Sequence, residues 1–171
     1  ININGNMVGN AAIVYRGNSS FNSDRLKNPF NIDLNKEDDK ANYQGYKTIK
    51  LANVIADPSF LREVLSYSIA GQYMTVPQAN YAKVSVNETA IGMYVNIEAV
   101  NKSFLKKHFD DTNPVLFKAD PNWEAAKAEG CDKTTGASLQ YLGEDVACYQ
   151  ATYELKSGDE SAWKSLIELT E

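Results

Sequence analysis

Short apolar stretches separated by polar turns fill the first hundred residues, and a single helical pattern interrupts them. Phe30, Ile32 and Leu34 alternate with polar residues, which is the period of a strand with one buried face. Residues 87–89 are expected to turn the chain so that the two strands flanking them pair as a hairpin. The expected strands are residues 11–15, 30–34, 46–51, 82–86 and 93–97. This succession predicts an α+β fold built on an antiparallel sheet.

One helix is expected between the third and fourth of these strands. Asp57 is a favourable N-cap and Pro58 suits the first helical position, so the helix should begin there and end near Tyr73. Leu61, Leu65 and Ile69 recur at a spacing of four residues and predict the buried stripe. The expected core comprises Val14, Phe30, Ile32, Leu61, Leu65, Ile69, Val84, Val95 and Ile97.

Beyond residue 100 the expected elements are shorter. Asn101 can cap a helix that reaches Phe109, and residues 115–117 and 139–142 are predicted to form brief strands. Residues 120–137 are expected to form a loop.

A last helix should carry Trp163, Leu166 and Ile167 on its buried face. Ser157 and Glu160 have the spacing of a capping box before it.

Cys131 and Cys148 are the only cysteines. Their spacing matches no zinc-binding pattern, because such a site needs more ligands. As free thiols they would be small core residues. As a disulfide they would contribute about 3 kcal/mol of stability and indicate an oxidising compartment. We favour the disulfide.

Composition restricts the class of protein. The 171 residues fit one domain or one large lobe, with 43% hydrophobic and 23% charged residues, as in ordinary globular proteins. The net charge of −5 argues against a nucleic-acid partner, since phosphate contacts need clustered Lys and Arg. No run of 18 apolar residues is present, so no membrane span is expected.

A polar loop follows the first strand directly. Such a loop can direct backbone N–H groups, hydroxyls and a guanidinium toward one anion, although many polar loops after strands are plain turns. Its residues are Arg16, Gly17, Asn18, Ser19 and Ser20.

The loop is accompanied by further motifs in a fixed order. They are residues 27–34 (Lys-Asn-Pro-Phe-Asn-Ile-Asp-Leu), 57–62, 91–98, 116–120 and 153–156. Together with the Arg-Gly-Asn-Ser-Ser loop, this set resembles the CotH (spore coat protein H) kinase family. The resemblance implies an atypical protein-kinase-like fold that transfers phosphate from ATP to Ser or Thr of secreted, coat or surface proteins. The expected order of strands and helices is also that of the amino-terminal lobe of a protein kinase.

Under this resemblance the loop would contact the phosphates of ATP bound with Mg²⁺ or Mn²⁺. Lys27 is the first candidate for the phosphate lysine, with Lys50 and Arg25 as alternatives. Arg62 could contact the phosphates and Glu63 the phosphate lysine. Each of these charges could instead be an ordinary solvated side chain.

Two further residues are candidates at more distant positions. Glu98 begins a segment placed to pair its backbone with adenine, and Lys118 is a further anion candidate. The other expected partner is a Ser-rich protein substrate, and the protein is expected to be a monomer that is secreted, on the cell surface or on the spore coat.

The family's catalytic Asp and its Trp-Asp-x-Asp metal segment have no counterpart in these residues. We therefore expect the chain to be the amino-terminal portion of a CotH domain and to be inactive alone. Residues 1–100 would be lobe-like, and residues 101–171 would hold the hinge, an insert and the first carboxyl-terminal-lobe helices. The alternative is a non-catalytic CotH-like module that binds at a surface or cell wall.

Overall fold

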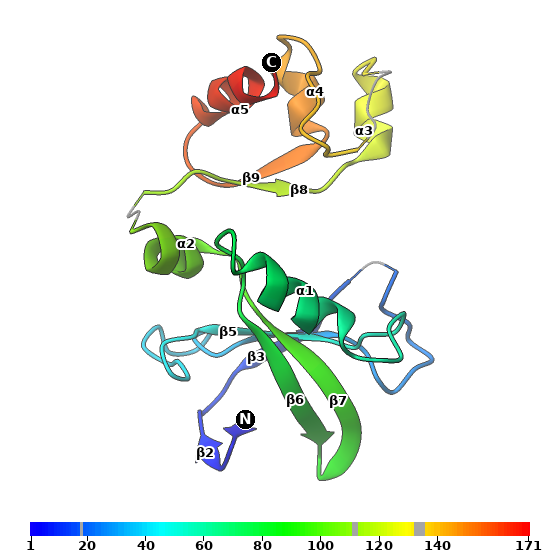
Figure 1. Cartoon of the computed structure of the whole chain (residues 1–171), viewed down its shortest axis with the longest axis vertical. Coiled ribbons are helices and arrows are strands. Elements are labelled where there is room, and N and C mark those ends of the chain that lie inside the picture. Colours follow the sequence, from blue (N-terminus) through cyan, green and yellow to red (C-terminus); the bar gives the residue numbers. More distant parts are fainter. Residues whose placement is uncertain (18, 111–112, 132–135) are drawn as a thin grey trace. The chain divides into compact units, whose positions relative to one another are not determined.

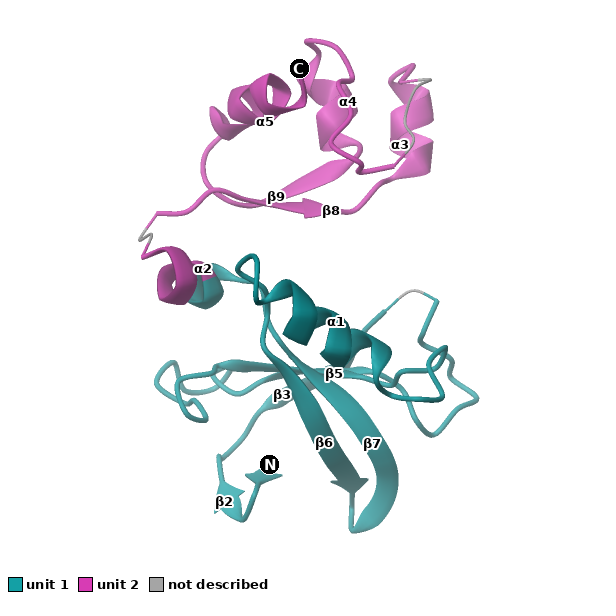
Figure 2. Ribbon diagram, viewed as in Figure 1, with its two compact units in different colours: residues 1–104 teal, residues 105–171 magenta. Residues whose placement is uncertain are grey.

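A computed structural model describes residues 1–17, 19–110, 113–131 and 136–171. These residues form two compact units, Ile1–Phe104 and Leu105–Glu171, coloured separately in Figure 2.

The first unit is built on a five-stranded antiparallel sheet (Figure 1). The strands, in spatial order, are β3 (Ala12–Tyr15), β4 (Phe30–Asp33), β5 (Thr48–Ala52), β7 (Thr89–Glu98) and β6 (Ala79–Val86). The α+β class, the antiparallel sheet and all five expected strands are confirmed. A separate two-stranded ribbon of β1 (Asn2–Ile3) and β2 (Asn6–Met7) precedes them and was not expected.

The sheet core is centred on Ile32, Leu34, Leu51 and Tyr94. Tyr94 and the adjacent Val95 are both fully buried, so both faces of β7 are covered, because successive side chains of a strand point to opposite faces. Of the expected core, Ile32, Val95 and Ile97 are buried.

Val14 is 54% exposed, so its expected place in the core is wrong. The reason is its strand: β3 lies at the edge of the sheet and has a neighbour on one side only.

The hairpin between β6 and β7 turns at Asn87 and Glu88. Both residues have left-handed φ angles, 47° and 68°, as a two-residue turn of matching twist requires. The expected hairpin is therefore confirmed.

Helix α1 (Arg62–Ala70) begins later than expected. Asp57 is not its N-cap: the Asp57 carboxylate accepts hydrogen bonds from the backbone N–H groups of Ser59 and Arg62, at 3.1 and 2.9 Å. Phe60 adopts a φ of 60°, and its carbonyl accepts a hydrogen bond from the Tyr81 hydroxyl at 3.0 Å. A tight, non-helical turn therefore separates Asp57 from the helix.

The expected buried stripe of α1 is also wrong. Leu61, Leu65 and Ile69 are each more than half exposed. Helix α1 packs against β6, and its half-buried residues are Glu63, Val64, Tyr67 and Ala70. Both sets have helical spacing, and the observed face is rotated from the expected one.

The second unit contains a two-stranded antiparallel ribbon and short helices. Its elements are α2 (Lys102–Phe109, which starts in the first unit), β8 (Leu116–Ala119), α3 (Trp123–Ala128), α4 (Val146–Gln150), β9 (Tyr153–Ser157) and α5 (Ala162–Thr170). Asn101 caps α2 as expected, because its side-chain oxygen accepts bonds from the N–H groups of Ser103 and Phe104.

Three expectations for this unit are corrected. The expected loop at 120–137 contains α3, whose first turn is capped by the Asn122 side chain at 3.0 Å from the Ala125 nitrogen. Residues 139–142 form no strand, and Leu139 turns the chain with a φ of 54°. Ser157 ends β9 rather than capping α5.

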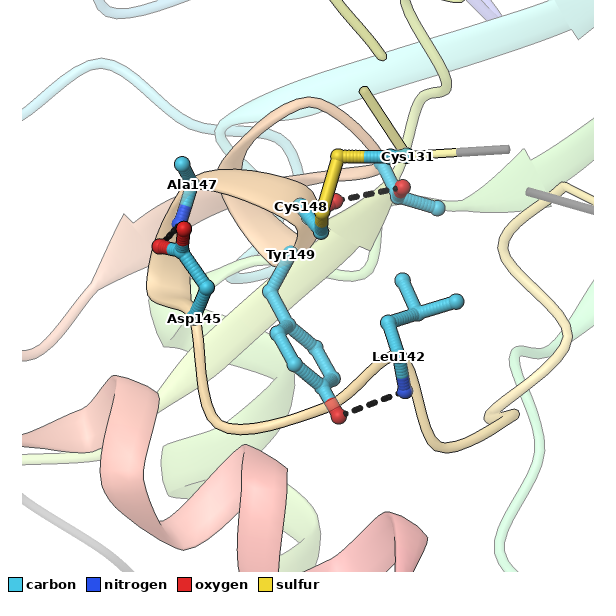
Figure 3. Close-up of a disulfide and its surroundings, with 7 residues drawn as sticks. Cys131, Leu142, Asp145, Ala147, Cys148 and Tyr149 are labelled. Atoms are coloured by element: carbon cyan, nitrogen blue, oxygen red, sulfur yellow. Dashed lines mark hydrogen bonds between the residues drawn. A yellow bond between two sulfur atoms is a disulfide. The ribbon is translucent and has the colours of Figure 1, made fainter. Parts of the chain in front are cut away.

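The core of this unit and its disulfide agree with expectation. Trp163, Leu166 and Ile167 of α5 are buried with Tyr149 and Tyr153. Cys131 and Cys148 form a disulfide with their Cα atoms 5.7 Å apart (Figure 3). It joins the segment after α3 to α4.

Candidate functional site

A pocket of about 420 Å³ opens where three segments of the first unit meet. The β3–β4 loop (residues 16–29) contributes one wall, the turn after β5 contributes another, and the first turn of α1 closes the third side. The lining residues are Arg16, Gly17, Ser19, Ser20, Pro29, Ala52, Asn53, Val54, Ile55, Ala56, Asp57, Arg62 and Glu63.

The β3–β4 loop is closed at its base and tightly turned at its start. The Arg16 backbone N–H donates to the Pro29 carbonyl at 3.1 Å, one step beyond the last residue pair of β3 and β4. Gly17 has a φ of 86°, and a Cβ at this position would lie 2.2 Å from the Ser20 Oγ. The glycine is therefore needed both for its left-handed backbone and for the space that the Ser20 hydroxyl fills.

Arg16 brings positive charge to the pocket wall. Its Nη1 is buried and has no hydrogen-bond partner among the described residues. A buried guanidinium donor without an acceptor is costly, and an anion in the pocket is the kind of group that would satisfy it.

Glu63 and Asp57 supply the opposite charge in the same pocket. Burial raises the pKa of Glu63, and the nearby Arg16 guanidinium offsets part of that rise. A hydrogen bond from the Ser59 hydroxyl is the main reason that the pKa of Asp57 lies below its usual value. The Asp57 carboxylate thus stabilises the turn before α1, whereas the Glu63 carboxyl group interacts electrostatically with the Arg16 guanidinium.

Arg62 is the second cation of the pocket and is largely exposed. Its side chain is 74% exposed, its Nη1 donates to the Ala56 carbonyl at 3.1 Å, and its Nε lies 3.8 Å from the Asp57 carboxylate. The pocket therefore combines two guanidinium groups and serine hydroxyls with the carboxyl groups of Asp57 and Glu63. The guanidinium groups and hydroxyls suit a small anionic group such as a phosphate.

The structure brings some of the predicted site residues together. Arg16, Gly17, Ser19, Ser20 and Arg62 line one pocket. Asn18 lies outside the described residues. The role of all these residues in binding nucleotide stays a prediction.

Lys27 does not line this pocket. Its ammonium group lies 4.6 Å from the centroid of the Phe60 ring and 5.2 Å from that of Tyr94, a cation–π arrangement. Burial lowers the pKa of Lys27 from its ordinary value. This lysine therefore ties the β3–β4 loop to the turn before α1 and to the sheet.

The other predicted site residues are not among the residues that line the pocket. Lys50 sits within β5 between Asn31 and Ile97 of the flanking strands. Glu98 is buried at the end of β7, where its carboxylate accepts the Gln78 backbone N–H at 3.1 Å. Lys118, on β8 of the second unit, pairs with Asp120.

Sequence reasoning missed one buried polar residue of the pocket, Asn53. A polar side chain directly after the alternating strand β5 is the signal that could have found it.

Among the described residues, no group of three or more His, Cys, Asp and Glu side chains is arranged to hold a metal ion. No helix of the described part is long and apolar enough to span a bilayer.

The sequence was compared with known families and proteins. The model of the family described as CotH kinase protein matches residues 13–171. The chain belongs to the CotH family. All the pocket-lining residues lie within the part of the chain that the CotH family model matches.

A curated relative of this CotH chain is the "Inner spore coat protein H" of Bacillus subtilis (strain 168), which is 27% identical over 119 residues. The matched part is 69% of this chain and 30% of that protein, so the chain matches less than a third of the length of its relative. The predicted resemblance to the CotH family is confirmed.

Proposed function

We propose that this CotH chain binds the phosphates of ATP in the pocket between the β3–β4 loop, the turn after β5 and α1. It would be the nucleotide-binding part of an ATP-dependent protein Ser/Thr kinase. The observation that carries the proposal is the meeting of Arg16, Gly17 and Ser20 of the β3–β4 loop with Arg62 of α1 in one pocket. The element order strand, loop, strand, strand, helix, hairpin supports it, because that order was expected for the amino-terminal lobe of a kinase.

The guanidinium groups and hydroxyls of the pocket fit a phosphate group, and the carboxyl groups of Asp57 and Glu63 share the same lining. Arg16 Nη1 is a buried donor without an acceptor among the described residues, and the space beside Gly17 is filled by a hydroxyl rather than by carbon. In this proposal Arg16 and Arg62 neutralise phosphate charge, and the hydroxyls of Ser19 and Ser20 orient the oxygens. ATP supplies the phosphoryl group, and Mg²⁺ or Mn²⁺ is proposed to enter with it.

We propose narrower roles for the remaining predicted contact residues. Lys27 acts through the loop that it anchors, and Lys50 is the next lysine to test. The backbone after Glu98 is proposed to pair with adenine. Lys118 would serve anion binding in the second unit.

We also propose that the parent protein acts in an oxidising or extracellular setting, on the cell surface or the spore coat. The disulfide between Cys131 and Cys148 supports this setting, since such bonds persist where thiols are not kept reduced. The spore coat relative points the same way. A Ser-rich coat or surface protein is the proposed substrate, and the protein is proposed to act as a monomer.

Nucleotide titration tests the proposal directly. Mg²⁺–ATP is titrated into the ¹⁵N-labelled 171-residue chain, and the amide signals of Gly17, Ser19 and Ser20 are followed. We expect weak, saturable binding, with a Kd on the order of 1 mM, that Arg16→Ala weakens at least tenfold.

Lys164→Ala is the matched control, because it removes a cation of the second unit whose side chain is 83% exposed and which is not among the proposed contacts. It should leave these signals and the affinity unchanged. Absence of binding by the wild-type chain, or equal affinity in Arg16→Ala, would refute the proposal. Nucleotide binding by a longer CotH protein without transfer to Ser or Thr would instead favour the non-catalytic binding module.

A further inference from the structure

A single buried side chain forms hydrogen bonds with both the first and the last part of the β3–β4 loop. Asn53, the residue after β5, is 4% exposed and lines the pocket. Its Nδ2 donates to the carbonyl of Ser20 at 2.9 Å and to the carbonyl of Lys27 at 3.2 Å. One amide group therefore holds the start and the end of the loop against the end of a central strand.

We infer that Asn53 is the positioning residue of the phosphate pocket. It fixes the Ser20 backbone, and with it the neighbouring pocket residues Arg16, Gly17 and Ser19, at the distance from α1 that lets both sides contact one anion. This inference rests on the proposed function and adds to it the residue that sets the geometry of the pocket.

The chemistry at position 53 leaves few alternatives to an amide. Both partners are carbonyl oxygens, so the side chain must donate two hydrogen bonds from one group. An aliphatic residue would leave both carbonyls without that donor in a buried place, and a carboxylate would bring negative oxygens against them.

The residue that follows carries backbone strain in support of this placement. Val54 has a φ of 54°, which is unfavourable for a β-branched residue, and it lines the same pocket. Its carbonyl accepts the Asp57 N–H at 3.1 Å. Strain of this kind persists only where surrounding contacts hold it, and here they hold the strand end that presents Asn53.

A second buried asparagine in the same loop provides a matched comparison. Asn28 is 2% exposed and bonds to the backbone of Asn22 and Arg25 at 2.7–2.9 Å. Neither partner lines the pocket. Asn28 thus stabilises the outer part of the loop, whereas Asn53 stabilises the part that faces the pocket.

The test compares Asn53→Ala with Asn28→Ala in the 171-residue chain. The Kd values for Mg²⁺–ATP and for inorganic tripolyphosphate are measured from amide shifts, and the melting midpoint of each variant is recorded. We expect both variants to lower the melting midpoint. Asn53→Ala should weaken binding of both probes at least tenfold, and Asn28→Ala should change it less than threefold.

Asn53→Ser is a milder variant that can donate one bond, and it should fall between wild type and Asn53→Ala in affinity. It keeps the test decisive if Asn53→Ala fails to fold. Without ligand, the amide signals of Gly17 and Ser19 should shift in both Asn53 variants and stay in place in Asn28→Ala.

The outcomes separate the two proposals. If the wild-type chain binds and the Asn53 variants bind equally well, the inference is wrong. It is also wrong if Asn53→Ala and Asn28→Ala, for the same drop in melting midpoint, lose the same amount of affinity, because Asn53 would then be only structural. If the wild-type chain binds neither probe, the proposed function fails and the inference falls with it.

Discussion

Gly17→Ala isolates the physical requirement of the β3–β4 loop. Gly17 and Gly45 have nearly the same φ, 86° and 87°, but they differ in their surroundings. A Cβ at position 17 would meet the Ser20 Oγ at 2.2 Å, whereas a Cβ at position 45 would have no heavy atom within 4 Å. The pair therefore separates the cost of the backbone angle from the cost of the contact.

The expected magnitudes follow from these two terms. The left-handed angle costs an ordinary residue about 1–2 kcal/mol, which is all that Gly45→Ala should lose. In Gly17→Ala the Ser20 side chain must also leave its rotamer, which adds about 0.5–1.5 kcal/mol. With Ser20→Ala in the same chain, the nearest atom becomes the Ser20 Cβ at 3.6 Å, an ordinary contact. The double variant should therefore regain the added part.

Urea unfolding provides the assay, read from the amide signals of β4 and β5 so that only the first unit is followed. The Gly17 and Ser20 variants form a double-mutant cycle whose coupling energy measures the contact. A cycle without coupling, or a Gly17→Ala variant no less stable than Gly45→Ala, would contradict the proposed role of Ser20 in filling the space beside the glycine.

Three further predictions concern the helices, the disulfide and the pocket carboxylate. Leu65→Ala should lower the free energy of unfolding by no more than about 0.5 kcal/mol, because the side chain is exposed. Leu166→Ala, in the buried core of the second unit, should lower it by about 2–5 kcal/mol. Urea melts measure both losses, and a larger loss for Leu65→Ala than for Leu166→Ala would contradict the prediction. Thiol titration of the denatured, non-reduced protein should find no free thiol, and reducing the bond between Cys131 and Cys148 should cost the second unit about 3 kcal/mol; two titratable thiols in protein from its native compartment would contradict this. Because the pKa of Glu63 is raised in the folded chain, its contribution to stability is present below its usual pKa and is lost as the pH rises through the folded value. Glu63→Gln should remove that pH dependence, and it should also strengthen tripolyphosphate binding at neutral pH by removing a negative charge beside Arg16; an unchanged pH profile of stability would refute this reading of the pocket.

The five strands of the main sheet could be predicted because their sequence signal is local, whereas the short ribbon of β1 and β2 was not expected. Ile32 and Leu34 alternate with polar neighbours, and Asn87 and Glu88 take the left-handed turn that joins two strands. Each of these signals is carried by residues a few positions apart, so no tertiary information is needed to interpret it.

The orientation of α1 could not be predicted in the same way. Leu65 and Ile69 lie on one helical stripe and Val64 and Tyr67 on another, and periodicity ranks the more apolar stripe as buried. The structure buries the other stripe in part, against β6. Which stripe faces the sheet depends on how the chain leaves the turn at Phe60, whose left-handed backbone carries no sequence signal that propensity can detect.

Which positively charged side chains line the pocket also depends on tertiary contacts that the sequence does not reveal. The resemblance to the CotH family made Lys27 the first candidate for the phosphate lysine. In the structure its ammonium group lies against Phe60 and Tyr94, which come from two distant segments. That contact partly desolvates the lysine and commits it to holding the loop, so the charge on the pocket wall comes from Arg16 and Arg62. A guanidinium suits this position, because its donors form a planar fork that can bind two oxygens of one phosphate at once. If the proposed function is correct, phosphate affinity should therefore respond to Arg16→Lys almost as strongly as to Arg16→Ala, since a lysine retains the charge and loses the fork.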